Sequence, residues 1–370
     1  MRVQQLSPPD GPPSYTVVDD DGLPIEVVDQ YLEYLTARNS SPNTVRSYAF
    51  DLRDFWTFLN QRDLDPLAVN VEDLAGWMAW LRLPRALRGS ERSVLPIDQT
   101  PHLRPATISR KLSAVVAFYE FVGQRDVTVL ALLDQLRQGR PRGTGRYQPF
   151  LSHLSRARAK PGRTLTVSVP SRRPSVLSPA QVQSVLEGCS NRRDRLFFGT
   201  LWETGVRVSE ALGLRIEDLD ERRGSVRITP RHNANGARVK GSKERVVPVG
   251  RRFVRLAIDY LTLDYGTTDS DYLFVNLYGG RVGMPWSYDS VDDLVRRTRL
   301  KVGFYFTPHM FRHTYSTRLL QAGARIEIVS ELLGHADIQT TRAIYGHLNV
   351  EDLRAELDRV GWLDDSEVLL

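Results

Sequence analysis

The chain has 370 residues, enough for two domains that each bury a hydrophobic core, and its 41% hydrophobic and 25% charged residues are ordinary for a globular protein. No apolar run reaches the roughly 20 residues that a membrane helix needs, and residues 1–21 lack an apolar signal core, so a membrane protein and an exported protein are both disfavoured. The net charge of +6 is compatible with a nucleic-acid partner without demanding one, and the single cysteine, Cys189, excludes an internal disulfide and a cysteine-ligated zinc.

The N-terminal part is predicted to be an all-α domain behind a disordered tail. Residues 1–22 are rich in proline and aspartate and show almost no core-forming pattern, so we expect no packed structure there. Between residues 23 and 136, apolar residues recur at helical spacing. The predicted helices cover about 25–35, 44–59, 71–83, 105–122 and 130–136. A polar, proline-containing stretch over 85–104 is predicted to be a loop.

Two of these helices begin with hydroxyl residues followed by basic ones, at Ser41–Tyr48 and at Ala106–Lys111. Free N–H groups at a helix start bind phosphate well. Simple N-capping with solvated cations explains either start alone, but two such starts in one small domain favour contacts with a DNA backbone. The candidate DNA-binding residues are Thr44, Arg46, Tyr48, Thr107, Arg110 and Lys111.

Residues 137–176 are predicted to be a basic linker between domains. Arginine and lysine recur through residues 137–173 without one aspartate or glutamate, glycine and proline are frequent, and apolar periodicity is poor. An all-positive tether repels itself unless an anion neutralises it, so we favour DNA as its neighbour over solvent alone.

The second predicted domain covers residues 177–362 and is mostly helical, with a short tail at 363–370. Ser178 and Pro179 mark its first helix, and a buried helix over 196–204 ends at Gly205. Alternating apolar residues predict two strands, 226–229 and 245–249, joined by a polar loop. Further helices are predicted over 206–212, 251–265, 287–301, 308–322, 325–333, 337–345 and 350–361.

One helix of this domain presents an imidazole beside a guanidinium. Pro308 suits the first helical position, and His309 and Arg312, three residues apart, then share a face. Such a pair suits a phosphate, although an ordinary surface pair has the same spacing. His309 and His313 also have a zinc-ligand spacing, with His335 as a third ligand. Because Arg312 would repel a cation and the expected glutamate is absent, we expect no metal.

Five short motifs follow one another along this domain: Thr204–Glu210, Lys240–Val249, Pro308–His313, Leu332–His335 and Tyr345–His347. In this order and spacing they resemble the tyrosine recombinase (phage integrase) family of site-specific DNA recombinases, over about residues 25–360. The resemblance implies a mainly α fold with a small antiparallel β-sheet in the C-terminal domain. It also implies a two-domain, C-shaped clamp, with a helical, SAM-like core-binding domain and an α+β DNA breaking–rejoining domain.

The resemblance assigns the reacting groups. Tyr345 would attack a DNA phosphodiester and form a 3′-phosphotyrosine, and Lys240 would protonate the departing 5′-oxygen as general acid. Val239 stands where the family often has glycine, so Lys243 is kept as an alternative general acid. Lys243 and Arg245 are also candidates for DNA contacts. Tyr345 could instead be a core tyrosine, and Tyr278, Tyr305 and Tyr315 would then be equal candidates for the nucleophile. Its spacing from the Leu332–His335 motif selects Tyr345.

The remaining family positions surround the phosphate. Arg207 and Arg312 would clamp its non-bridging oxygens, His335 would hydrogen-bond to it, and His309 would assist proton transfer at the tyrosine. Glu210, one helical turn from Arg207, would orient that arginine. Fixed cations would take the place of a metal, so we expect no cofactor.

The family also implies partners: double-stranded DNA, a homotetramer on two DNA sites with a dimer per site, accessory DNA-bending or directionality proteins, and no membrane. We expect a cytoplasmic, nucleoid-associated enzyme, and the long tail, loop and linker favour a mobile-element integrase or transposase. A catalytically silent DNA-binding regulator on the same fold and a type IB topoisomerase are the alternatives. The last helix, 350–361, packs either on its own domain or on a neighbouring subunit, and the sequence leaves both open.

Overall fold

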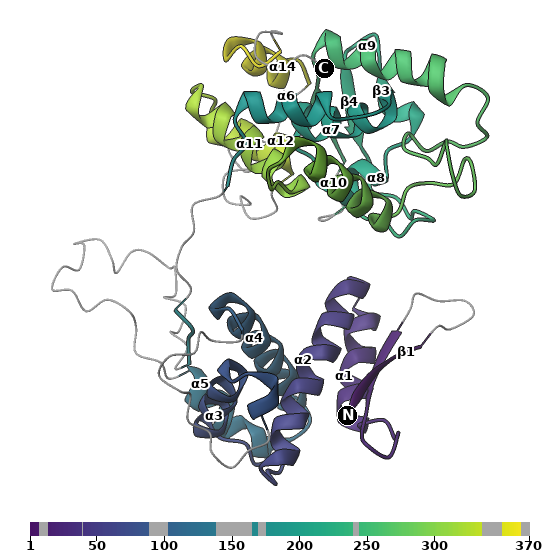
Figure 1. The fold of residues 1–370 in the computed structure, drawn as a ribbon. Helices are drawn as coiled ribbons and strands as arrows, with labels where there is room; N and C mark the ends of the chain where they lie inside the picture. The colour runs from purple at the N-terminus through teal and green to yellow at the C-terminus, as the bar shows by residue number, and fades with distance from the viewer. Residues whose placement is uncertain are drawn as a thin grey trace, which may run out of the picture. The chain divides into compact units, whose positions relative to one another are not determined.

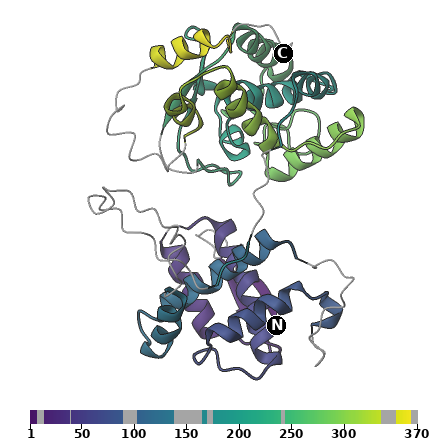
Figure 2. The ribbon, with the colours of Figure 1, turned by 90° about the vertical axis from the view of Figure 1, so that its left-hand side faces the viewer.

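The computed structural model describes residues 1–6, 14–38, 40–88, 103–137, 165–168, 175–239, 244–334 and 350–363. The chain divides into two compact units, Met1–Ser171 and Arg172–Leu370, drawn in Figure 1 and, turned by 90°, in Figure 2. The division falls within the predicted basic linker. Each unit encloses a hydrophobic core of its own.

The first unit is built from helices around an aromatic core. Edge-to-face ring pairs join Phe55 to Trp77 and Tyr119, and Trp56 to Phe118, so the helices that carry these rings pack on one another. The helices are α1 (Glu26–Ala37), α2 (Pro42–Gln61), α3 (Val71–Arg82), α4 (Pro105–Val122) and α5 (Leu130–Arg137), with short 3₁₀ turns η1 (Arg85–Leu87) and η2 (Val127–Val129). All five helices predicted from the sequence are present.

Local sequence explains where these helices start. Ser41 caps α2 by accepting a hydrogen bond from the backbone N–H of Thr44 (3.2 Å), and Pro42 takes the first helical position. Asn70 and Asp73 form a reciprocal capping box at the start of α3. These caps satisfy N–H groups that the helix itself leaves unpaired.

The prediction of a disordered tail over residues 1–22 is wrong for the part of this segment that the structure describes. Strands β1 (Arg2–Leu6) and β2 (Ser14–Val18) form an antiparallel pair in which Val3 lies opposite Val17. Tyr15 and Val17 are buried in the core of the first unit, and β2 packs on α1 and α2. The two strands pair with each other and cover a helix surface, and this tertiary burial outweighs the poor pattern of so short a segment.

In the second unit, helix α7 is surrounded by other elements. It packs on α6, α9 and α11, and its rings Phe197 and Phe198 contact Phe274, Phe306 and Phe311 (Figure 1). The helices are α6 (Pro179–Glu187), α7 (Arg192–Thr204), α8 (Val208–Leu212), α9 (Arg251–Tyr260) with the π-helical turn η4 (Leu261–Tyr265), α10 (Tyr288–Val302), α11 (Pro308–Gln321), α12 (Ile326–Leu333) and α14 (Val350–Arg359). The predicted helix at 337–345 lies outside the described residues.

The sheet of the second unit has three antiparallel strands in the order β3–β4–β5. The predicted strands are β4 (Ser225–Ile228) and β5 (Arg245–Pro248), paired with Val226 opposite Val247. The two-residue strand β3 (Leu219–Asp220) pairs with the other edge of β4. A 3₁₀ turn, η3 (Ile216–Asp218), precedes β3. The expected fold class, mainly α with a small antiparallel sheet in the C-terminal domain, is confirmed.

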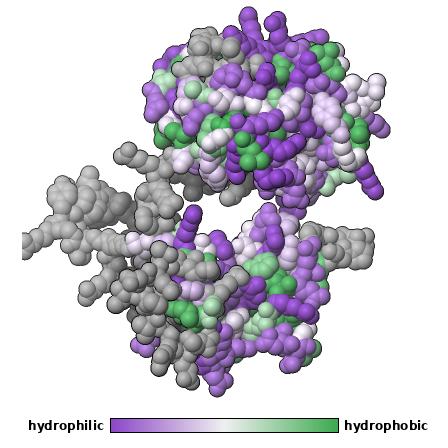
Figure 3. Space-filling view, in the orientation of Figure 1, coloured by the Kyte–Doolittle hydropathy of each residue, from purple (hydrophilic) through white to green (hydrophobic). Residues whose placement is uncertain are grey.

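Hydrophilic residues predominate on the face of the second unit that Figure 3 shows. None of the helices in the described part of the chain combines the length and the apolarity needed to cross a bilayer.

Candidate active site

The site begins where α7 ends. Gly205 has a left-handed backbone (φ +60°), and a Cβ at this position would lie 2.5 Å from Cδ1 of Tyr315 and 3.0 Å from Cδ2 of Leu333. Only glycine meets both demands without strain. Arg207, the residue before α8, follows two residues after this glycine.

Glu210 holds Arg207 in place. Its carboxylate accepts hydrogen bonds from the backbone N–H of Arg207 (2.9 Å) and from its Nη1 (3.0 Å). Glu210 is fully buried and also pairs with Arg245. Burial alone would raise the pKa of the Glu210 carboxyl, but hydrogen bonds and charge from Arg245 and Arg207 outweigh it and lower the pKa from its ordinary value. The carboxylate is therefore ionised, and its two hydrogen bonds hold Arg207.

Arg312 reaches the same place from helix α11. Pro308 occupies the first position of that helix, and one turn later the guanidinium of Arg312 donates to the carbonyls of Gly205 (2.9 Å) and Leu333 (2.8 Å). Its side chain is 4% exposed. Burial and the charge of Arg207 lower the pKa of Arg312 to about 10, so it stays protonated at neutral pH. Two anchors thus fix the plane of a charged fork that has five N–H donors.

His309 lies one turn before Arg312 and is exposed. Its ring stands 4.3 Å from the ring of His313, centroid to centroid, at 73°. Partial burial of this otherwise exposed side chain lowers the pKa of His309, and the charges of His313, Arg312 and Arg207 lower it further. Because Arg207 influences both His309 and Arg312, groups from two distant motifs share one electrostatic site.

The structure therefore brings together four of the predicted site residues, Arg207, Glu210, His309 and Arg312. The other predicted catalytic residues, Lys240, His335 and Tyr345, lie outside the described residues, as does Lys243. Their roles stay predictions. No group of three or more His, Cys, Asp or Glu side chains in the described ranges could hold a metal ion.

Arg245 has a different place from the one predicted. It was expected to contact DNA, but its side chain is buried, pairs with Glu210 (2.6 Å) and donates from Nε to the carbonyl of Leu332 (2.9 Å). The structure corrects the expected DNA contact. In the sequence, Arg245 is one of several basic residues at the start of a predicted strand, so no local signal marks it as buried.

Among the other tyrosines, Tyr315 is ruled out as an accessible nucleophile. It is fully buried against Gly205 and Trp362, and burial raises its pKa. Tyr278 and Tyr305 are 62% and 70% exposed. Both are suitable control positions for Tyr345.

The predicted DNA-binding residues of the first unit fall into two groups. Arg46 is exposed above the ring of Phe50, and Thr44 is hydrogen-bonded to the Ser41 hydroxyl. Lys111, in contrast, is buried, and its ammonium pairs with Asp51 (2.9 Å) and Asp54 (2.8 Å). This correction removes Lys111 from the candidate DNA contacts.

Arg110 is exposed and also pairs with the buried Asp51, while it donates to the hydroxyl of Ser47. Tyr48 and Thr107 are partly buried. Contacts of these residues with DNA remain proposals.

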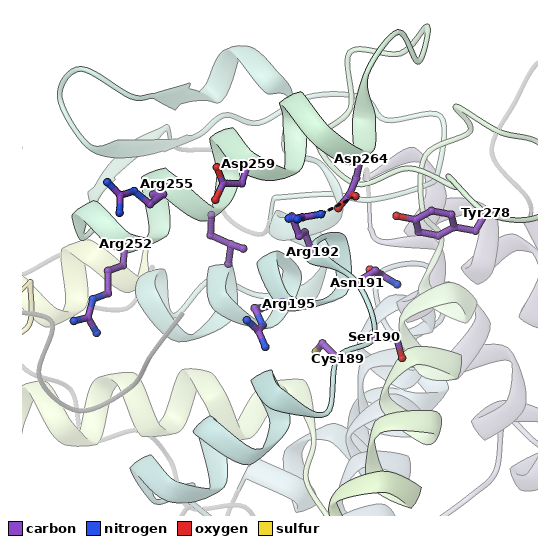
Figure 4. A pocket seen from close by; sticks show the side chains of 11 residues that line it. Cys189, Ser190, Asn191, Arg192, Arg195, Arg252, Arg255, Asp259, Asp264 and Tyr278 are labelled. Atoms are coloured by element: carbon purple, nitrogen blue, oxygen red, sulfur yellow. Dashed lines mark hydrogen bonds and ion pairs between the residues drawn. The ribbon is translucent and has the colours of Figure 1, made fainter.

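A pocket of about 960 Å³ lies away from these groups, between the first half of α7 and helix α9 (Figure 4). Four arginines line it: Arg192, Arg195, Arg252 and Arg255. Cys189 also lines it, and burial raises the pKa of its thiol to about 12, so the thiol is unreactive at neutral pH. The candidate chemistry lies at the other end of α7, where Arg207 follows Gly205.

Several known proteins are similar to this chain over most of its length. Residues 175–352 match the model of the phage integrase family, and residues 28–126 match the phage integrase N-terminal SAM-like domain. Transposase A from transposon Tn554 of Staphylococcus aureus is 32% identical over 363 residues, which are 97% of this chain and 98% of that protein. The chain belongs to the phage integrase family. The predicted class of enzyme, a tyrosine-type site-specific DNA recombinase, is confirmed.

Other members of the family are also similar. Tyrosine recombinase XerD of Mycobacterium tuberculosis (strain ATCC 25618 / H37Rv) is 32% identical over 341 residues, 88% of this recombinase and 93% of that one. The integrase of transposon Tn1549, solved in complex with transposon right end DNA, has a TM-score of 0.55 at 20% identity and covers 90% of this chain and 99% of its own. XerH recombinase in a post-cleavage complex has a TM-score of 0.54 at 20% identity, with 90% and 83% covered. These two structures establish the fold.

Proposed function

We propose that this recombinase cuts and rejoins double-stranded DNA through a covalent 3′-phosphotyrosine at Tyr345. The observation that carries the proposal is the convergence of Arg207 and Arg312 at the end of α7, with His309 one turn from Arg312. Two guanidiniums and an imidazole from separate motifs are suited to a phosphodiester that gains negative charge in its transition state.

The proposed reaction balances without a cofactor. The phenol oxygen of Tyr345 forms a bond to phosphorus while the bond from phosphorus to the 5′-oxygen breaks, and the electron pair leaves with that oxygen. Lys240, or Lys243 in its place, donates the proton that makes the 5′-hydroxyl. His309, whose lowered pKa keeps its imidazole unprotonated at neutral pH, takes the phenolic proton. The reverse steps with another 5′-hydroxyl rejoin the DNA.

The arginines differ in how they would meet the phosphate. Arg207 keeps 26% of its side chain exposed, whereas Arg312 is nearly covered and doubly anchored. We infer that Arg207 meets the phosphate at the surface and Arg312 lies in the floor of the site. Because neither guanidinium has to reorient, the charge that develops on the oxygens meets prepositioned donors.

The biological reaction we propose is movement of a DNA element. Support comes from the Tn554 transposase, which is similar over almost the full length of both chains. The first unit would hold the DNA backbone through Thr44, Arg46, Tyr48, Thr107 and Arg110. A dimer on each DNA site and a tetramer on two sites, with accessory DNA-bending or directionality proteins, complete the proposal.

A nicked suicide duplex tests the reaction. The duplex is selected for binding from a randomised pool and then nicked near the bound centre, so that cleavage releases a short strand and traps the protein. The wild-type protein should form a covalent adduct, Tyr345→Phe should bind but form none, and Tyr278→Phe and Tyr305→Phe should behave as wild type. Binding without any wild-type adduct would favour a silent regulator, and relaxation of supercoils without site preference would favour a topoisomerase.

A further inference from the structure

A buried chain of charges links strand β5 to the candidate active site. Arg245, the first residue of β5, donates from Nη2 to Glu210 Oε2 (2.6 Å) and from Nη1 to Glu210 Oε1 (3.4 Å). The same carboxylate accepts from the backbone and side chain of Arg207 (2.9 and 3.0 Å). Glu210 is 1% exposed and Arg245 is 8% exposed, so solvent screens this network little.

The far side of the Arg245 guanidinium is fixed by the end of helix α12. Its Nε donates to the carbonyl of Leu332 (2.9 Å), while Arg312 donates to the next carbonyl, that of Leu333 (2.8 Å). The last carbonyls of a helix have no partner within it. Two guanidiniums therefore satisfy adjacent carbonyls at one helix end, one from a predicted catalytic arginine and one from Arg245.

The glycine after α12 gives an independent sign of the same contact. Gly334 has a left-handed backbone (φ +62°), and a Cβ there would lie 2.9 Å from Nη1 of Arg245. The guanidinium thus lies directly against the backbone at this turn. A larger residue at position 334 would displace the group that holds Glu210.

We propose that Arg245 is a positioning residue for the cleavage reaction. It acts through Glu210 to hold Arg207 at the angle that the phosphate requires, and Leu332 and Gly334 fix Arg245 itself. Since its side chain is buried and committed to these partners, it does not touch DNA. The inference rests on the proposed cleavage reaction and adds a residue to it.

Arg193 provides a matched control in the same unit. It is 7% exposed, pairs with Asp194 (2.9 Å) and donates to the carbonyl of Val275 (3.1 Å). Like Arg245, it joins a carboxylate to a backbone carbonyl, but it lies at the start of α7, away from Arg207. A purely structural loss should therefore be similar for the two arginines.

The experiment compares Arg245→Lys with Arg193→Lys on the nicked duplex under single-turnover conditions with saturating protein. Lysine keeps the charge but loses the fork. We expect Arg245→Lys to lower the rate of adduct formation roughly 100-fold, without a change in duplex affinity, and Arg193→Lys to leave the rate unchanged. Melting temperatures of both variants are measured alongside to show that they fold.

A double-mutant cycle tests whether the effect of Arg245 passes through Arg207. In an Arg207→Lys background, adding Arg245→Lys should cost almost no further rate, because the group it positions is already gone. If the rate losses of Arg207→Lys and Arg245→Lys multiply in the double variant, the positioning role is wrong. It is also wrong if the Arg245 and Arg193 variants react at equal rates while the wild type is active. Neither result would count against the proposed reaction itself. A wild-type protein that forms no adduct would overturn the proposed reaction as well.

Discussion

Arg207 and Arg312 bring like charges together at the end of α7, next to His309. Burial and the charge of Arg207 lower the pKa of Arg312 to about 10, and burial with the charges of His313, Arg312 and Arg207 lowers the pKa of His309. Glu210 is a compensating carboxylate, but it is already shared by Arg207 and Arg245. The site therefore has an excess of positive charge that a phosphate would relieve, and we expect it to bind anions for this reason.

His309 should titrate below its ordinary value of about 6.5 in the free protein. Burial is the larger cause, and His313, Arg312 and Arg207 add to it. Because the folded pKa is lowered, the stability linked to neutral His309 is present above about pH 6.5 and is lost as the pH falls toward the folded pKa. NMR titration of the imidazole, assigned with His309→Gln, measures the midpoint. His313→Ala should raise it, and a midpoint above 6.5 in the wild type would contradict this account.

At the scale of single elements, the turn after α7 matters most. Gly205→Ala should destabilise the protein by about 2–5 kcal/mol, since left-handed strain costs about 1–2 kcal/mol and overpacking against Tyr315 adds about 1–3. Gly303→Ala is the control: Gly303 ends α10 with φ +75° and a Cβ there would meet nothing within 4 Å. Denaturant unfolding should show that Gly303→Ala loses only the free energy of the left-handed strain. Equal losses would show that the close approach at Gly205 has no cost.

The hairpin of the first unit should contribute to stability. Val17 is fully buried, so Val17→Ala should cost about 1–2 kcal/mol through lost burial and a residual cavity. Gln4→Ala, on the paired strand and exposed, should change little. Chemical denaturation measures both. If neither substitution changes the free energy of unfolding, β2 adds nothing to this core.

Elements with a strong helical period were predictable from the sequence, and α1 to α5 begin and end close to the expected residues because apolar spacing and caps agree. The hairpin was missed because a five-residue strand gains its stability from α1 and α2, which local pattern does not report. The same limit applies to the site. Motif order predicted Arg207, Glu210, His309 and Arg312, whereas the internal roles of Lys111 and Arg245 depend on carboxylates distant in sequence.

At the scale of the whole molecule, DNA affinity should depend on salt through the exposed cations of the first unit. Arg46→Ala should weaken binding and reduce the slope of log K against log salt by about 0.9, the change for one lost phosphate contact. Arg125 is an exposed arginine beyond the C-terminal end of α4, and Arg125→Ala should leave the slope unchanged. Fluorescence anisotropy over a salt series measures both, and an unchanged slope for Arg46→Ala would remove it from the DNA surface.

The central claim is that a tyrosine attacks DNA within the cluster formed by Arg207, Arg312 and His309. The most direct test isolates the covalent adduct on the nicked duplex, digests protein and DNA, and locates the modified peptide by mass spectrometry. The account predicts a 3′-phosphonucleotide on Tyr345, lost in Tyr345→Phe and strongly reduced in Arg207→Ala and Arg312→Ala. An adduct on another residue, or one that forms at full rate without either arginine, would contradict it.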